Sequence, residues 1–215
     1  MDTPLTDVEA RILGSLIEKE LTTPDNYPLS LNALMSACNQ TSNREPVVQY
    51  DEGTVSHAIE SMRKRSLVRA VQQSGSRVMK YRHMVAETLN LDARQTALVC
   101  VLLLRGPQTV GELKTRTARL ASFESLEQVD AALDTLIARA AGSLVVRLPR
   151  RPGQKEVRVA HLMAGEVSVD AYEAATSKPE RATDRIGAVE ESVDELRKEI
   201  ADLRSQLESF RKQFE

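Results

Sequence analysis

Hydrophobic residues over most of the chain recur at every third or fourth position, which is the spacing of one helix face. The first such stripe consists of Val8, Ile12, Leu13, Leu16 and Ile17. A Ser or Thr followed three residues later by Glu or Gln is typical of a capping box, in which two side chains satisfy free backbone amides at a helix start. Three pairs fit this motif: Thr6 with Glu9, Thr109 with Glu112, and Ser125 with Gln128.

Residues 1–85 read as three helices followed by a β-hairpin. After the first helix, Ser30 caps a second that runs to Cys38, and a third starts near Asp51. Two β-prone runs within residues 67–84 then flank a Gln-Ser-Gly-Ser turn, which is the pattern of a hairpin.

The same order recurs over residues 86–163, after a short connector expected at 85–90. The inward positions of the two third helices match at a constant offset of 74 residues: Val55, Ile59 and Met62 in one copy, and Val129, Leu133 and Leu136 in the other. An internal duplication of this kind indicates a repeated structural unit. Three helices and a hairpin are typical of the winged-helix variant of the helix-turn-helix. We therefore predict a mainly α protein with small β-hairpins (α+β), made of two tandem winged-helix domains that each enclose an aliphatic core.

The C-terminal part follows a different pattern. Residues 164–185 lose periodicity and contain Pro179, which predicts a linker. Residues 186–215 carry a heptad seam, which predicts a coiled-coil helix. The seam comprises Ile186, Val189, Val193, Leu196, Ile200, Leu203, Leu207, Phe210 and Phe214. β-branched residues at the early a positions and Leu at d favour a parallel homodimer. The alternative is a helix that folds back on its own chain.

Composition places the chain among globular cytoplasmic proteins. It is 41% hydrophobic and 28% charged, and its start lacks the apolar segment of a signal peptide. No apolar run approaches the roughly 20 residues of a membrane span. Cys38 and Cys100 fall on apolar helix faces, where free cysteines are usually buried.

We find no pattern that predicts catalysis. The chain has no CxxC motif, its three histidines are scattered, and it has no phosphate-binding glycine loop or nucleophile elbow. We therefore expect no enzymatic activity, no metal and no cofactor.

Cationic and polar side chains suggest contact with nucleic acid instead. On the third helix of the first unit, Ser56, His57, Arg63 and Lys64 point outward, where they can meet bases or phosphates. The second unit carries a larger cationic set on its hairpin and preceding helix: Lys114, Arg116, Arg119, Arg147, Arg150, Arg151, Lys155 and Arg158. Several phosphate contacts would give salt-sensitive affinity. The alternative is that both sets only keep the surface soluble.

Two features argue against a simple DNA-binding protein. The net charge is −2, and the third helix of the second unit exposes the acidic residues Glu127, Asp130 and Asp134. An acidic face there would repel phosphate. Our leading hypothesis is a DNA-associated regulatory protein that dimerises through its tail, and the alternative is a protein-interaction scaffold that does not bind DNA.

The polar stretch 38–55 lies where a helix-turn-helix has a short turn. Asn39, Asn43 and Arg44 supply donors and acceptors close to the chain. Such side chains often brace irregular backbone. The stretch therefore predicts either a braced connector or a site for a partner or ligand.

The chain also resembles the YceH-like family of uncharacterised bacterial proteins along nearly its whole length. The stretches that carry the resemblance are long: "LTDVEARILGSLIEKELTTPDNYPLS", "ACNQTSNREPV", "RVMKYRHM", "LLLRGPQTVGELKTRTARL" and "VVRLPRRPGQKEVRVAHL". The resemblance implies two winged-helix domains in tandem, and it implies no particular activity or catalytic residues.

Overall fold

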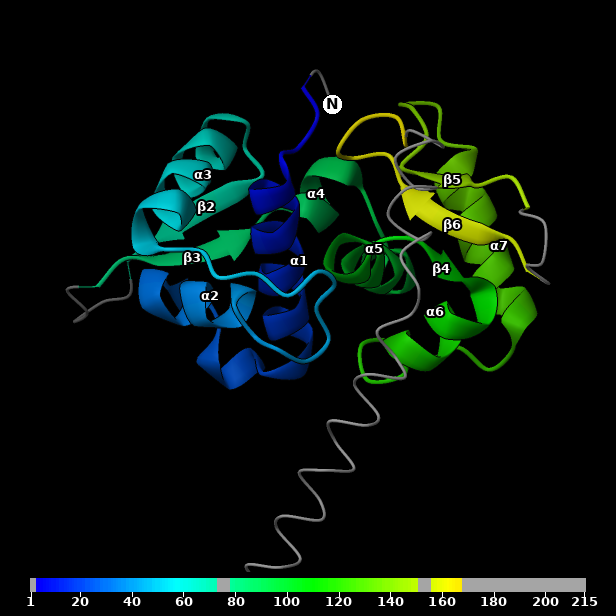
Figure 1. The fold of residues 1–215 in the computed structure, drawn as a ribbon, viewed down its shortest axis with the longest axis horizontal. Coiled ribbons are helices and arrows are strands. Elements are labelled where there is room, and N and C mark those ends of the chain that lie inside the picture. Colours follow the sequence, from blue (N-terminus) through cyan, green and yellow to red (C-terminus); the bar gives the residue numbers. More distant parts are fainter. Residues whose placement is uncertain (1–2, 73–77, 151–155, 168–215) are drawn as a thin grey trace, which may run out of the picture. The chain divides into compact units, whose positions relative to one another are not determined.

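The computed structural model describes residues 3–72, 78–150 and 156–167, which form a mixed α/β fold with small antiparallel sheets (Figure 1). The part of the predicted linker after Val167 and all of the predicted coiled coil lie outside the described residues, as do Arg151 and Lys155.

The first repeat contains the three predicted helices and the hairpin. Its elements are α1 (Asp7–Thr22), the 3-10 helix η1 (Pro24–Asn26), β1 (Leu29–Ser30), α2 (Leu31–Cys38), α3 (Glu52–Lys64), β2 (Val68–Val71) and β3 (Lys80–His83). Asp51 is the N-cap of α3, where its side chain accepts a hydrogen bond from the Thr54 amide. The predicted start of this helix is therefore confirmed.

The second repeat has the same order of elements. They are α5 (Ala93–Arg105), β4 (Gln108–Thr109), α6 (Val110–Thr117), α7 (Leu126–Ile137), β5 (Val145–Arg147) and β6 (Arg158–His161). The connector expected at 85–90 instead contains a short helix, α4 (Val85–Leu89). Asn90 follows it in a left-handed conformation and ends the helix.

The two sheets have equivalent topologies. Their strand orders are β1-β3-β2 and β4-β6-β5, and every pairing is antiparallel. In the hairpins, Val68 lies opposite His83 and Val145 lies opposite His161. Both hairpins are thus confirmed. The third strands, β1 and β4, were not predicted because two residues are too few to show an alternating pattern.

The capping interactions also follow the sequence, with one correction. The Thr6 amide donates to Glu9 Oε2 at 2.8 Å, and the Glu9 amide donates to Thr6 Oγ1 at 3.2 Å. Thr109 and Glu112 repeat this arrangement. Ser125 caps α7, but the Gln128 side chain accepts from the Glu124 amide and not from that of Ser125. The third capping box is therefore incomplete.

The two repeats share one core, where we expected two separate ones. The buried aliphatic residues of both repeats form one continuous cluster, and residues 1–167 form one compact unit that includes the expected boundary at 85/86. Helix α1 packs on α5 so closely that a Cβ on Gly14 would lie 2.8 Å from Leu104 Cγ. In the same contact, Cys100 Sγ donates to the Gly14 carbonyl at 3.4 Å.

This packing buries both cysteines as free thiols. Burial raises the pKa of the Cys38 thiol to about 11 and raises that of Cys100 further. Both thiols are therefore protonated at neutral pH, and the interpretation of the cysteines as small buried residues is confirmed. Among the described helices, none combines the length and the apolar character needed to cross a membrane.

Candidate functional site

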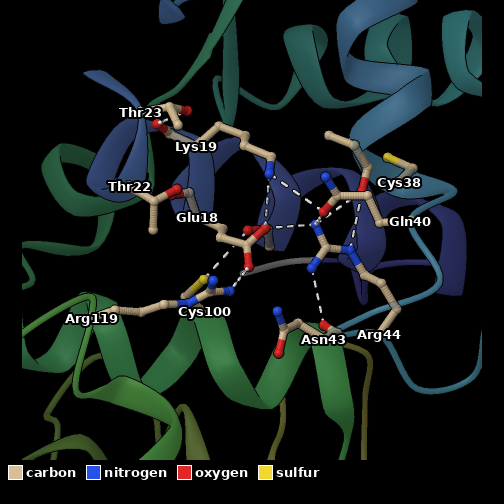
Figure 2. A network of polar contacts seen from close by, with 12 residues as sticks. Glu18, Lys19, Thr22, Thr23, Cys38, Gln40, Asn43, Arg44, Cys100 and Arg119 are labelled. Atoms are coloured by element: carbon tan, nitrogen blue, oxygen red, sulfur yellow. Dashed lines mark hydrogen bonds and ion pairs between the residues drawn. The ribbon is translucent and has the colours of Figure 1, made fainter. Parts of the chain in front are cut away.

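The stretch between α2 and α3 is organised around a buried arginine. Arg44 is only 5% exposed, and its Nη2 donates to Glu18 Oε2 on α1 at 2.6 Å. Its Nε and Nη2 also donate to the Ala37 carbonyl at the end of α2, at 3.1 and 2.9 Å. Figure 2 shows the guanidinium between Glu18 and Gln40, whose Oε1 accepts at 3.0 Å. Arg44 therefore ties the loop to two helices of the first repeat.

Glu18 extends this network into the second repeat. Its second oxygen, Oε1, accepts from Arg119 Nη2 at 2.7 Å (Figure 2). Burial raises the pKa of Glu18, but the hydrogen bond and charge of Arg44, with the charges of Lys19 and Arg119, more than offset this effect and hold the pKa below its usual value. Glu18 is therefore an ionised carboxylate that joins the two repeats.

Asparagines brace the same loop. Asn39 Nδ2 donates to the Tyr50 carbonyl, and the Tyr50 amide donates back to Asn39 Oδ1, both at 2.8 Å. Asn43 has a left-handed backbone with φ of 58°, which Asn tolerates better than most residues. Its side-chain oxygen accepts from Arg105 on α5. The loop therefore has the bracing contacts that its composition predicts.

A pocket of about 320 Å³ opens beside this network. Glu18 and Asn43 line it from the first repeat. The second repeat contributes Arg105 from α5, and Arg116 and Arg119 from α6 and the turn that follows it. The polar loop and three arginines thus meet at one cavity.

Among the described cations predicted to contact nucleic acid in the second repeat, three have acidic partners in the same repeat: Arg116, Arg147 and Arg158. Arg147 on β5 pairs with Asp130 at 3.0 Å and with Asp134 at 2.9 Å, both on α7. Arg158 on β6 lies 2.9 Å from Glu112. The acidic face of α7 and the cationic hairpin therefore neutralise each other in part.

The described cations of this set other than Arg147 and Arg158 lie on or after α6 and after β5. Arg116 lies 3.6 Å from Glu112, and Lys114 Nζ donates to the Glu124 carbonyl at 3.1 Å. Arg119 binds Glu18, and Arg150 is exposed after β5. Of the described residues of this set, Arg116 and Arg119 meet at the pocket, and the proposed contact of the whole set with nucleic acid stays a prediction.

The predicted face of α3 is open to solvent. Its inner side buries Val55, Ala58, Ile59 and Met62. On its outer side, His57 and Lys64 are exposed, Ser56 is half-buried, and exposed Arg63 lies 2.6 Å from Glu60.

Two residues of the network were not predicted from the sequence. Glu18 and Arg105 occupy polar positions on helices, where solvent exposure is the usual expectation. The sequence feature that pointed toward a contact between the repeats was the long apolar run of α5, in which Thr96 through Leu104 are all buried. That run implies that other elements surround α5, but it does not identify α1 as one of them.

Comparisons with known proteins give a consistent result. A family model described as "Protein of unknown function, DUF480" matches residues 5–154. A UPF0502 protein of Opitutus terrae is 50% identical over 175 residues, which cover 81% of this chain and 76% of the relative. A UPF0502 protein of Vibrio vulnificus is 48% identical over 199 residues, which cover 88% of this chain and 90% of the relative.

Proposed function

We propose that this chain, which belongs to the DUF480 (UPF0502) family of bacterial proteins of unknown function, is a DNA-associated regulatory protein. In this proposal each repeat is a winged-helix unit, the first repeat makes the main contact with DNA, and the C-terminal tail pairs two chains.

The topology supports the winged-helix assignment. Each repeat has a helix, a short strand, two further helices and a hairpin, and the second hairpin strand pairs with the short strand to give a three-stranded sheet. In winged-helix proteins the third helix lies in the major groove and the hairpin contacts the backbone or the minor groove. In the first repeat the third helix is α3 and the hairpin is β2–β3 (Figure 1), so we propose that these two elements contact DNA.

Helices α3 and α7, the third helices of the two repeats, differ in charge, and we assign the main DNA contact to the first repeat for this reason. At the offset of 74, Arg63 and Lys64 correspond to Ile137 and Ala138. Helix α7 contains no Lys or Arg, and two of its carboxylates, Asp130 and Asp134, bind Arg147. Because phosphate contacts require cations or neutral donors, α3 is the better DNA-contacting helix.

In this proposal the C-terminal tail pairs two chains into a dimer. Its heptad seam lies outside the described residues, and the sequence pattern supports the pairing. Pairing two chains would hold two α3 helices close together. The second contact with DNA would then be intramolecular, which raises the overall affinity for neighbouring sites.

A gel-shift titration of the full chain with a mixed-sequence duplex at increasing salt tests DNA binding. We expect a shift at low salt that weakens as salt rises. Replacement of Arg150, Arg151 and Lys155 by Ala measures how much the hairpin of the second repeat contributes to DNA affinity. Arg147→Ala serves as its control because that side chain is bound to α7. Absence of a shift at low salt would remove DNA as the partner.

One observation favours a second candidate function, a protein-interaction scaffold. Helix α7 begins with Leu126, which is 46% exposed, beside the exposed acidic residue Glu127. An exposed apolar side chain with an acidic neighbour suits a basic, partly apolar protein segment better than DNA. A crosslinked pull-down that returned one stoichiometric protein and no nucleic acid would support the scaffold.

A further inference from the structure

We propose that the pocket between the two repeats binds a small organic oxyanion, a phosphate or carboxylate attached to a short apolar body. The site is defined by Arg105, Arg116 and Arg119 on its cationic side and by residues of α5 on its apolar side. This inference does not depend on DNA binding.

The first support is the concentration of positive charge. Three arginines and one carboxylate, Glu18, are the charged residues among those that line the pocket. The pKa of Arg105 is lowered by burial and by the nearby positive charges of Arg116, Arg119 and Arg44, while Glu45 partly opposes this effect. Like charges so close together repel one another, and an anion between them would relieve the repulsion.

The second support is the number of available donors. A guanidinium has five N–H groups. Within the described part of the chain, Arg119 donates to Glu18 and Arg105 donates to Asn43, each through one nitrogen. Arg116 lies 3.6 Å from Glu112, beyond hydrogen-bonding distance. Several N–H groups at the pocket therefore remain for a ligand, and their planar forks suit phosphate and carboxylate oxygens.

Glu18 does not cancel this charge. Its carboxylate already accepts from buried Arg44 at 2.6 Å, on the side away from Arg119. The positive charge of Arg44 neutralises the Glu18 carboxylate through Oε2. The other oxygen of Glu18, Oε1, orients the Arg119 guanidinium at the pocket. We therefore assign Glu18 and Arg44 as positioning residues and not as ligand contacts.

The apolar residues that line the pocket indicate the chemical character of the rest of the ligand. Cys100, Val101 and Leu104 of α5 line it together with Leu120. Cys100, Val101 and Leu104 are nearly fully buried, so half-buried Leu120 and the hydrocarbon stems of the arginines offer most of the apolar surface. A fully hydrated ion such as free phosphate gains nothing from this surface, whereas a ligand with an apolar body packs against it. A volume of about 320 Å³ suits a molecule with one small ring or a short chain.

A ligand there would touch both repeats at once. Asn43 comes from the loop of the first repeat, and the three arginines come from the second. Binding would therefore stabilise the contact between the repeats, because any ligand that binds only the folded state shifts the unfolding equilibrium.

An NMR titration of the full-length protein tests the proposal with phenyl phosphate and benzoate as probes, and with benzyl alcohol as the neutral control. We expect saturable amide shifts at Cys100–Arg105 and Arg116–Leu120 with at least one of the two anions, and much weaker binding of the alcohol. The stronger anion identifies the oxyanion class. Failure of both anions to saturate at about 10 mM, near the weak limit of specific binding, would overturn the proposal. Equal binding of benzyl alcohol would also overturn it.

Two variants locate the site. Arg119→Gln and Arg116→Gln should each weaken anion binding about tenfold, as expected for loss of one charge-assisted contact. Glu18 keeps Arg44 as a partner in the first variant, and the second removes no hydrogen bond of Arg116, so both should fold. Arg69→Gln, at an exposed position of β2, is the matched control and should bind like the unmodified protein. An equal loss in all three variants would show nonspecific surface attraction and contradict the assignment.

Discussion

Arg44 and Glu18 form a buried ion pair, with 2.6 Å between Nη2 of the arginine and Oε2 of the glutamate. The two side chains are 0% and 4% exposed. Because Glu18 also binds Arg119 of the second repeat, the pair joins the loop of one repeat to the other. The loop for which the sequence predicted either a braced connector or a partner site is therefore also part of the contact between repeats.

Arg44→Met should lower the free energy of unfolding by about 3–5 kcal/mol, since it removes one partner of a buried charge and leaves Ala37 with an unsatisfied carbonyl. Chemical denaturation followed by circular dichroism measures this change. Arg63→Ala breaks an exposed pair with Glu60 and should cost only about 0–1 kcal/mol. Equal effects of the two substitutions would contradict the assigned role of Arg44.

Gly14→Ala should destabilise the protein by about 1 kcal/mol, because the new methyl group would lie 2.8 Å from Leu104 Cγ. The free-energy cost of this steric overlap exceeds the stability gained from the higher helix propensity of Ala. Gly53→Ala is the matched control at an exposed position of α3, where the nearest atom to the new methyl group is Asp51 Oδ1 at 3.6 Å. It should stabilise by about 0.5 kcal/mol. Thermal unfolding of both variants should therefore show midpoint shifts of opposite sign.

The positions of the helices and hairpins could be predicted because their signals are local. Thr6 with Glu9, Asp51 before α3, and the β-prone residues of β2 and β3 each specify structure within a few residues. The inward residues of the two third helices, which match at an offset of 74, are buried in both repeats, as their helical spacing predicts. Tail pairing, the winged-helix assignment and DNA contact remain predictions.

The contact between the repeats could not be predicted, because it depends on residues far apart in the chain. Ser15 and Glu18 look like the polar side of an amphipathic helix, yet both are buried in the structure. Gly14 gave no sign that another helix packs against it. Likewise, the sequence could not show that Arg147 would bind Asp130 and Asp134, since that pairing requires β5 to lie beside α7.

His161 makes stability depend on pH. Burial lowers its pKa from 6.5 to about 4, against a smaller opposing effect of Asp7, and its Nδ1 has no hydrogen-bond partner among the described residues. Between these pH values the unfolded chain binds a proton at His161 and the folded chain does not. Stability from this residue is therefore lost as the pH falls from 6.5 to 4, by about 1.4 kcal/mol per pH unit.

His161→Phe should remove this contribution. The difference in unfolding free energy between the two proteins, measured by denaturant titration across this pH range, should slope with pH and level off above 6.5. A constant difference across the range would show that His161 titrates alike in the folded and unfolded chains.

Deletion of residues 186–215 should halve the mass measured by sedimentation equilibrium, because the heptad seam that pairs the chains is removed. Residues 1–167 form a compact unit of their own, so their thermal unfolding should persist in the shortened protein. If the shortened protein keeps the mass of the full chain, the tail does not pair the chains.

The salt dependence of DNA affinity, measured by fluorescence anisotropy, tests the central claim that α3 carries the main contact. We predict that Arg63→Gln with Lys64→Gln lowers the slope of log affinity against log salt by about two, one unit for each lost phosphate contact. Arg147→Gln, in the second repeat, should leave the slope unchanged. An unchanged slope in the α3 double variant, or no measurable binding by the unmodified protein at low salt, would contradict the account.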